Sequence, residues 1–143
     1  REKMRLFWYE DTKYLTHDLA SLLAQQKTIA VNNGGYYGKE FEQLSKVTNN
    51  KDLLVRVPLL KHRLYMLKAK RVDFMIDDEL FGLYLISQEK IPGITLHPYV
   101  IHDNPIHFML SKKTVTMDNV RSINAAIIDM QSNIKQIIAS YTY

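Results

Sequence analysis

The sequence predicts an α/β fold in which a mostly parallel sheet is flanked by helices. From residue 28 onward, short runs rich in β-branched residues alternate with longer segments whose apolar residues recur at helical intervals. Glycine, proline and asparagine stand at many of the junctions. The 143 residues are enough for one domain with a core and too few for two complete ones.

The first two strand and helix pairs are predicted between residues 28 and 67. Residues 28–31 read as a strand that ends at Asn32-Asn33-Gly34-Gly35, and a helix follows with Tyr37, Phe41, Leu44 and Val47 at helical spacing. Residues 53–57 read as the second strand, and Pro58 opens a second helix. The apolar stripe of that helix is Leu60, Leu64 and Leu67.

A third strand is predicted over residues 72–76, and it ends in Asp77-Asp78-Glu79. These acids suit the positive end of a following helix, which carries Leu80, Leu83 and Tyr84. Residues 95–101 and 106–110 read as two further extended runs, separated by a turn.

The tail is predicted to be helical. Thr116 is the expected N-cap of a helix that buries Val120, Ile123, Ile127 and Met130, and helical spacing continues through Ile134, Ile137, Ile138 and Tyr141. Near the start of the chain, residues 15–23 read as a short amphipathic helix, whereas residues 1–9 mix basic and aromatic side chains with no clear period.

The amino-acid composition excludes several kinds of functional site. Lys and Arg total 19 against 15 Asp and Glu, and a formal net charge of +4 favours anionic partners only mildly. The absence of cysteine excludes disulfides, thiolate metal sites and cysteine nucleophiles, and favours an extracytoplasmic location slightly. No apolar run reaches the length of a membrane span, and Arg1 is followed by no signal pattern, so we expect a mature, signal-free chain.

Four blocks appear in a familiar order: residues 28–38 (TIAVNNGGYYG), 67–78 (LKAKRVDFMIDD), 107–113 (HFMLSKK) and 123–127 (INAAI). The chain resembles the type 2 periplasmic solute-binding proteins of amino-acid ABC importers. The resemblance implies a second lobe at residues 28–105, and a return strand and C-terminal helices at 106–143. It implies that residues 1–27 are what remains of a first lobe at its approach to the hinge, with most of that lobe absent.

The same resemblance implies a function and a site. The chain would be the periplasmic amino-acid-binding component of an ABC transporter, with a small amino acid or related zwitterion as ligand and the transporter permease as partner. Backbone N–H groups at Gly35 and Tyr36 would take the α-carboxylate, Asp78 would take the α-ammonium, and Tyr36 and Tyr37 would wall the site. It implies no enzyme activity, no cofactor and no metal.

Plainer interpretations stand beside these roles. The Asn33–Tyr36 loop is also consistent with a simple tight turn, and Asp77 and Asp78 with helix caps. Tyr37 heads an apolar stripe and is equally expected in the core.

Two other clusters favour no additional function. The basic residues spread around their helix on every side except the leucine stripe, so we expect a solvated helix and no nucleic-acid partner; they are Lys61, His62, Arg63, Lys68, Lys70 and Arg71. The five-residue spacing of His97, His102 and His107 fits neither helical neighbours nor one strand face, and it predicts no metal site.

Two rival functions stay open. An apolar strand ending in Asp77 is typical of a phospho-acceptor receiver domain, although Asn32 and Asn33 stand where a receiver carries an acidic pair. The same fold also serves as a ligand-sensing domain of a receptor or regulator. In either solute-binding role, helices meant to cover a first lobe would leave apolar surface exposed, so we expect a homo-oligomer.

Overall fold

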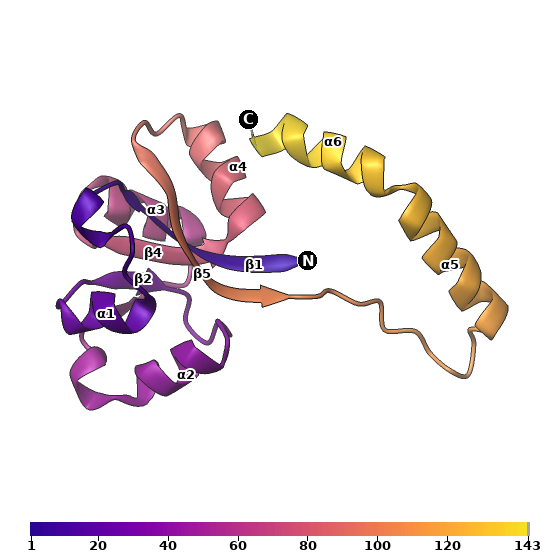
Figure 1. The fold of residues 1–143 in the computed structure, drawn as a ribbon, viewed down its shortest axis with the longest axis horizontal. Helices are drawn as coiled ribbons and strands as arrows, with labels where there is room; N and C mark the ends of the chain where they lie inside the picture. The colour runs from indigo at the N-terminus through magenta and orange to yellow at the C-terminus, as the bar shows by residue number, and fades with distance from the viewer. Residues whose placement is uncertain (143) are drawn as a thin grey trace. The chain divides into compact units, whose positions relative to one another are not determined.

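The computed structural model describes residues 1–142, in two compact units that span Arg1–Pro105 and Ile106–Tyr143. The first unit contains a five-stranded sheet in the order β3-β2-β4-β1-β5 (Figure 1). Its strands are β1 (Glu2–Tyr9), β2 (Ile29–Val31), β3 (Leu54–Arg56), β4 (Phe74–Asp78) and β5 (Ile94–Asn104). Its helices are α1 (Leu19–Ala24), α2 (Lys39–Lys46), α3 (Leu60–Lys68) and α4 (Glu79–Glu89), with 3₁₀ turns at Thr12–Tyr14 and Thr48–Asn50.

The predicted α/β class is confirmed, but the sheet is mixed where a mostly parallel one was expected. Strand β2 pairs parallel with β3 and β4, whereas β1 pairs antiparallel with both β4 and β5. Sequence patterning gave no sign of β1, because Leu6, Phe7 and Trp8 are all buried. A strand covered on both faces shows no alternation of apolar and polar residues. Residues 1–27 therefore lie within the sheet unit; their origin as part of a first lobe stays a prediction.

Strand β5 is longer than predicted, and no second strand follows it in the described residues. It continues through His102 and Asp103 to Asn104, because these residues pair with the start of β1. The pairing register shifts between Arg5 and Phe7, opposite Pro98, which lacks an N–H and is tolerated in an edge strand at a bulge. Residues 106–110 form no strand, so the predicted return strand is wrong: β1 begins at Glu2, opposite Asn104, and offers no further partner.

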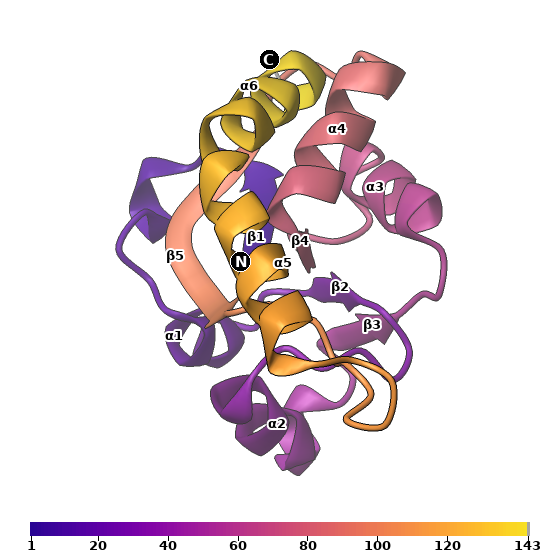
Figure 2. The ribbon, with the colours of Figure 1, turned by 90° about the vertical axis from the view of Figure 1, so that its right-hand side faces the viewer.

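The helices cover both faces of the sheet (Figure 2). On one face, Leu19, Leu22 and Leu23 of α1 and Phe41 of α2 pack with Trp8 and its neighbours. On the other face, the predicted leucine stripe of α3 packs with Phe7 and with side chains of α4. The predicted helix after Asp78 is present as α4. Leu80 is 36% exposed, while Gly82 is buried against the Phe7 ring.

The C-terminal unit holds α5 (Met117–Asp129) and α6 (Gln131–Thr142). Thr116 caps α5 as predicted, since its side chain accepts from the Asn119 N–H and the Asn119 side chain accepts from the Thr116 N–H. The predicted burial of the α5 stripe is wrong, because no residue of α5 is buried. So short a helical unit has too little apolar surface to enclose a core.

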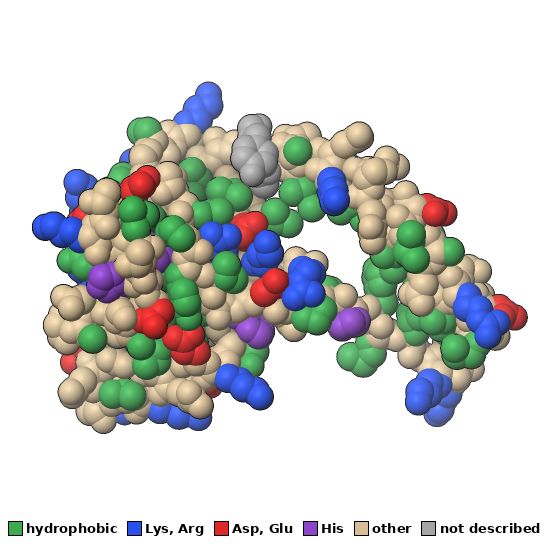
Figure 3. Space-filling view, in the orientation of Figure 1, with side chains coloured by type: hydrophobic (Ala, Val, Ile, Leu, Met, Phe, Trp, Pro, Cys, Tyr) green, Lys and Arg blue, Asp and Glu red, His purple; other side chains and the backbone are tan. Residues whose placement is uncertain are grey.

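Apolar side chains gather along this C-terminal unit (Figure 3). Five of the exposed ones recur at intervals of three and four residues and so share one side of the helices: Ile127, Met130, Ile134, Ile137 and Tyr141. Across residues 1–142, the helices are all too short or too polar to cross a membrane.

Candidate functional site

The candidate site lies at the edge of the sheet where the parallel strands end. Strands β2, β3 and β4 finish at Val31, Arg56 and Asp78, and parallel strands place these ends at one edge, where open α/β sheets bind ligands. Strands β2 and β4 are direct neighbours in the sheet. The structure thus brings the predicted glycine loop and Asp78 to adjacent strand ends.

Tyr37 shapes the loop between β2 and α2 from within. Its side chain is only 3% exposed, and its hydroxyl accepts a hydrogen bond from the Asn32 backbone N–H at 2.7 Å. Burial raises the pKa of the Tyr37 phenol, against smaller opposing effects of the Asn32 hydrogen bond and nearby cations. A Cβ added at Gly35 would lie 2.9 Å from the Tyr37 ring. Of the two interpretations of Tyr37, the structure therefore agrees with a core residue, and its buried side chain supports the loop.

Tyr36 lies on the outside of the same loop. Its side chain is 56% exposed, and its backbone N–H donates no hydrogen bond to the residues the structure describes. The loop ends at Gly38, whose φ of 94° lies in the region that favours glycine and which stands as N-cap of α2 without a side-chain cap. Unpaired backbone N–H groups beside a helix N-terminus attract an anion.

Asp78 is the N-cap of α4. Its Oδ1 accepts a hydrogen bond from the Phe81 N–H at 2.9 Å. The capping interpretation is thus confirmed for Asp78. Its second oxygen, Oδ2, makes no hydrogen bond within the described part of the chain, so the cap leaves one carboxylate oxygen available to a ligand.

Asp77 belongs to a buried ion pair that sequence reasoning missed. The Arg63 guanidinium bonds to Asp77 Oδ2 and also donates to the carbonyls of Val57 (2.7 Å) and Pro58 (2.9 Å). Asp77 Oδ1 accepts from the Asp78 N–H at 3.0 Å. Burial raises the pKa of the Asp77 carboxyl, and the Arg63 hydrogen bond and charge oppose that shift. The pair therefore ties the loop before α3 to the backbone that positions Asp78.

Arg63 also corrects the prediction of a fully solvated basic helix. It is 3% exposed, whereas Lys61, His62, Lys68, Lys70 and Arg71 are exposed as expected. A helical wheel could not separate Arg63 from them, because its buried partner comes from β4.

The three histidines go to three different surroundings. His97 is fully buried, with Nε2 2.7 Å from the Tyr14 carbonyl oxygen and Nδ1 accepting from the Tyr99 N–H. His102 packs edge to face on Tyr36, and its position on β5 brings it to the candidate site. His107 lies in the C-terminal unit. Within residues 1–142, the structure holds no cluster of three or more His, Asp or Glu side chains suited to a metal.

His102 and Arg63 are the residues near the site that the sequence did not single out for it. The sequence carries no local feature that assigns His102 to the site. Its place there follows from the pairing of β1 with both β4 and β5, which brings the end of β5 to the same edge as Asp78.

No family model and no curated protein matches the chain. Solved structures do. The second substrate-binding domain of Lactococcus lactis GlnP in its open conformation matches with a TM-score of 0.64 at 18% identity, over 99% of this chain and 58% of that one. The P235GK mutant of ArgBP from T. maritima matches with a TM-score of 0.63 at 18% identity, over 99% and 57%.

A histidine kinase sensor domain described as similar to periplasmic binding proteins matches less fully, with a TM-score of 0.52 at 16% identity over 71% of this chain and 41% of that one. The first of these three neighbours is named as a substrate-binding domain and the last as a sensor domain. The chain spans less than two thirds of each of them. At these identities the likeness establishes the fold, and the chain has the type 2 periplasmic-binding-protein fold of amino-acid ABC transporter substrate-binding domains.

Proposed function

We propose that the chain is the second-lobe part of the extracytoplasmic amino-acid-binding component of an ABC importer, located in the periplasm. One observation carries the proposal: a loop that offers an unpaired backbone N–H and a carboxylate with an unused oxygen stand at neighbouring strand ends. A donor for an anion beside an acceptor for a cation complements a small zwitterion.

Each predicted residue has a specific task in this proposal. The N–H groups of Gly35 and Tyr36 bind the α-carboxylate, beside the positive N-terminus of α2. Asp78 Oδ2 binds the α-ammonium while Oδ1 holds the helix cap. The exposed Tyr36 ring covers the apolar part of the ligand, and Tyr37 keeps the loop in shape from the core.

The proposal assigns this chain half of a closing site. Type 2 binding proteins trap ligands between two lobes, and the solved neighbours are longer than this chain, which spans 58% and 57% of two of them. The other lobe would supply the remaining contacts, and the complete protein would deliver its ligand to a transporter permease. Binding by this chain alone is therefore expected to be weak.

Thermal unfolding with each common amino acid at millimolar concentration tests the proposal. A ligand that binds the native state raises the melting temperature, and Asp78→Asn should abolish that rise because it removes the charge that pairs with the ammonium. Asp52→Asn is the matched control, since Asp52 is an exposed turn residue just before β3, at the opposite end of the parallel strands from Asp78. A rise that Asp78→Asn leaves unchanged would refute the assigned site.

A sensor domain is the second candidate, favoured by the likeness to the histidine kinase sensor domain. The same site would bind the ligand in both roles, so the sequences encoded on either side of this segment separate them. A transmembrane helix and a kinase encoded beside this segment would support sensing. A first lobe with a secretion signal encoded there would support transport.

The receiver-domain alternative is disfavoured. Asp77, its required phospho-acceptor, is held by the buried Arg63 guanidinium, and β1 runs antiparallel inside a sheet that a doubly wound receiver keeps parallel. Labelling of Asp77 by a phosphoryl donor in Mg²⁺ would reverse this conclusion.

We also propose that the chain self-associates through its C-terminal unit, whose apolar side is exposed from Ile127 to Tyr141. Sedimentation velocity at micromolar concentrations should show a dimer or larger species. Ile134→Glu and Ile137→Glu should shift it to monomer, and a monomeric wild type would overturn the proposal.

A further inference from the structure

Three consecutive acidic residues stand at the candidate site. Strand β4 ends in Asp77 and Asp78, and Glu79 is the first residue of α4. Asp78 Oδ2 makes no hydrogen bond within the described part of the chain. Three unpaired carboxylates at one strand end would attract dications and basic side chains. The partners of Asp77 and Glu79 therefore decide which ligand charge the site accepts.

An arginine from a different element holds each of the two flanking carboxylates. Arg63 of α3 bonds to Asp77 in the buried pair described above. Arg5 of β1 pairs with Glu79, with Nη1 2.5 Å from Glu79 Oε2. The Arg5 and Glu79 side chains are 14% and 21% exposed, so water and salt screen this pair less than a surface pair. Both flanking charges are thus neutralised by fixed cations.

The Arg5 side chain is fixed from two sides. Its Nη2 donates to the His97 carbonyl of β5 at 2.8 Å, and the antiparallel pairing of β1 with β4 places the Arg5 backbone opposite Asp77. Its Nε is buried and has no hydrogen-bond partner among the described residues, which costs free energy. The guanidinium therefore gives up one hydrogen bond in the geometry that reaches both His97 and Glu79. Glu79 is held in one orientation as a result and is not left to a ligand.

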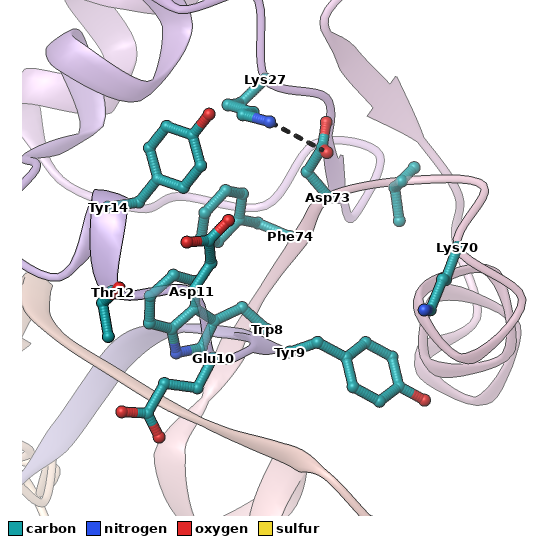
Figure 4. Close-up of a pocket in the computed structure, with 11 residues that line it drawn as sticks. Trp8, Tyr9, Glu10, Asp11, Thr12, Tyr14, Lys27, Lys70, Asp73 and Phe74 are labelled. Carbon is teal, nitrogen blue, oxygen red and sulfur yellow. Dashed lines mark ion pairs between the residues drawn. The ribbon is translucent and has the colours of Figure 1, made fainter.

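Adjacent acids elsewhere in the chain are not paired in this way. Glu10 and Asp11 follow β1 at the cavity beside Trp8, at the opposite end of the strands from the candidate site. Figure 4 draws one ion pair among the residues of that cavity, between Lys27 and Asp73, and none at Glu10 or Asp11. Asp73 directly precedes β4, so its carboxylate stands at the other end of the strand that carries the acidic triplet.

We propose that Arg5 is a positioning residue that sets the charge selectivity of the site, so that the ligand is an amino acid with an uncharged side chain. The inference rests on the proposed function. The α-ammonium takes the one available carboxylate oxygen of Asp78, and neither Asp77 nor Glu79 remains for a basic side chain. Arg5 and Arg63 are already paired, so they offer no cation to an acidic side chain.

Two pairs of ligands of similar shape test this selectivity. Arginine and citrulline differ by one positive charge, and glutamate and glutamine by one negative charge. We would titrate the ¹⁵N-labelled chain with each of the four compounds and obtain dissociation constants from the amide resonances of Gly35 and Tyr36. In the wild type, citrulline should bind at least as tightly as arginine, and glutamine at least as tightly as glutamate.

Breaking the pair from its two sides should change the selectivity in opposite directions. Arg5→Met releases the Glu79 carboxylate, so arginine should gain about tenfold over citrulline, the effect of one charge-assisted contact. Glu79→Gln leaves the Arg5 guanidinium without its anion, so glutamate should gain about tenfold over glutamine. The double variant has neither free charge and should return to the wild-type ratios. A purely structural defect would weaken all four ligands alike, so these ratios separate selectivity from stability.

Lys27→Met is the matched control. It also frees one carboxylate from its cation, that of Asp73, at the other end of β4. Neither ratio should change in this variant. If Arg5→Met does not fold, the glutamate-to-glutamine ratio in Glu79→Gln decides.

The outcomes separate this inference from the proposed function. It is overturned if the wild type binds arginine more tightly than citrulline or glutamate more tightly than glutamine. Unchanged ratios in folded Arg5→Met or Glu79→Gln, or the same change in Lys27→Met, would also overturn it. In each of these cases binding that still requires Asp78 leaves the proposed function standing. No binding of any of the four compounds, or binding that Asp78→Asn leaves intact, would refute the proposed site and this inference with it.

Discussion

Tyr36 and His102 pack edge to face, with ring centroids 5.5 Å apart and ring planes at 87°. The first belongs to the loop after β2 and the second to the far edge strand β5. A Cβ added at Gly38 would lie 2.9 Å from His102 Nδ1, so the same imidazole also limits the end of the loop. Strand β5 therefore supports the loop that offers its N–H groups at the candidate site.

His102→Ala should reduce the melting-temperature rise caused by an amino acid and lower stability only slightly. An aromatic edge-to-face pair contributes about 0.5–1.5 kcal/mol, and without it the Tyr36 ring loses its fixed position. Thermal unfolding with and without ligand measures both effects. Val100→Ala, an exposed position on the same strand, is the control, and an equal loss in both variants would contradict a specific role for His102.

Asp78 should show two separable effects. Asp78→Asn keeps a capping side chain, so stability without ligand should stay nearly constant while binding is lost; Asp78→Ala should lose about 1 kcal/mol as well. Asp18→Ala is the matched control, because Asp18 caps α1 by accepting from the Ser21 N–H at 2.8 Å. It should cost similar stability in urea unfolding and leave binding intact. A binding defect in Asp18→Ala would show that loss of any helix cap weakens binding, and would contradict a specific role for Asp78.

Arg63→Met should be among the most destabilising single substitutions, by about 3–5 kcal/mol, because it leaves the buried Asp77 carboxylate without its cation. Adding Asp77→Leu should restore much of the loss, since the unpaired charge is then gone. Urea unfolding measures both variants. Arg71→Met, at an exposed position close by, should change stability by no more than about 0.5 kcal/mol. A mild effect of Arg63→Met would mean that Asp77 is solvated.

Gly82→Ala should destabilise the fold although alanine favours helices. A Cβ at position 82 would overlap the fully buried Phe7 ring, and overpacking of this kind costs about 1–3 kcal/mol against a gain of about 1 kcal/mol in helix propensity. Phe7→Leu in the same chain should relieve the overlap, so the double variant should lose less than the two single changes added together. A stabilised Gly82→Ala protein would show that α4 shifts freely on the sheet.

His97 should make stability depend on pH. Burial lowers the pKa of the His97 imidazole, more than its hydrogen bond to the Tyr14 carbonyl raises it, so the unfolded chain binds a proton more readily than the folded one. The free energy of unfolding should therefore fall as the pH decreases through the ordinary value of 6.5, and level off below the folded pKa. His97→Gln should flatten this part of the profile. His107→Gln, at an exposed position, should leave it unchanged.

Local pattern was enough for most of the elements. Thr116 as a cap, the leucine stripe of α3 and the strand that leads into Asp78 are interactions between near neighbours in the chain, and their spacing is visible in the sequence. The glycine loop and Asp78 were identified by the same local features together with the resemblance to a known family. Strand β1 was not, because a strand buried on both faces has no period to detect.

The sequence by itself determined the α/β class, the succession of β2, α2, β3, α3, β4 and α4, and a carboxylate at the end of β4. Only the tertiary structure decided that β1 enters the sheet between β4 and β5, that Arg63 turns inward to Asp77, and that His102 reaches Tyr36. The cavity beside Trp8 also exists only through the meeting of distant segments. The physical reason is common to all of them, because each depends on contacts between residues far apart in the chain. The spacing of apolar residues within one segment does not identify the distant segment that packs against it.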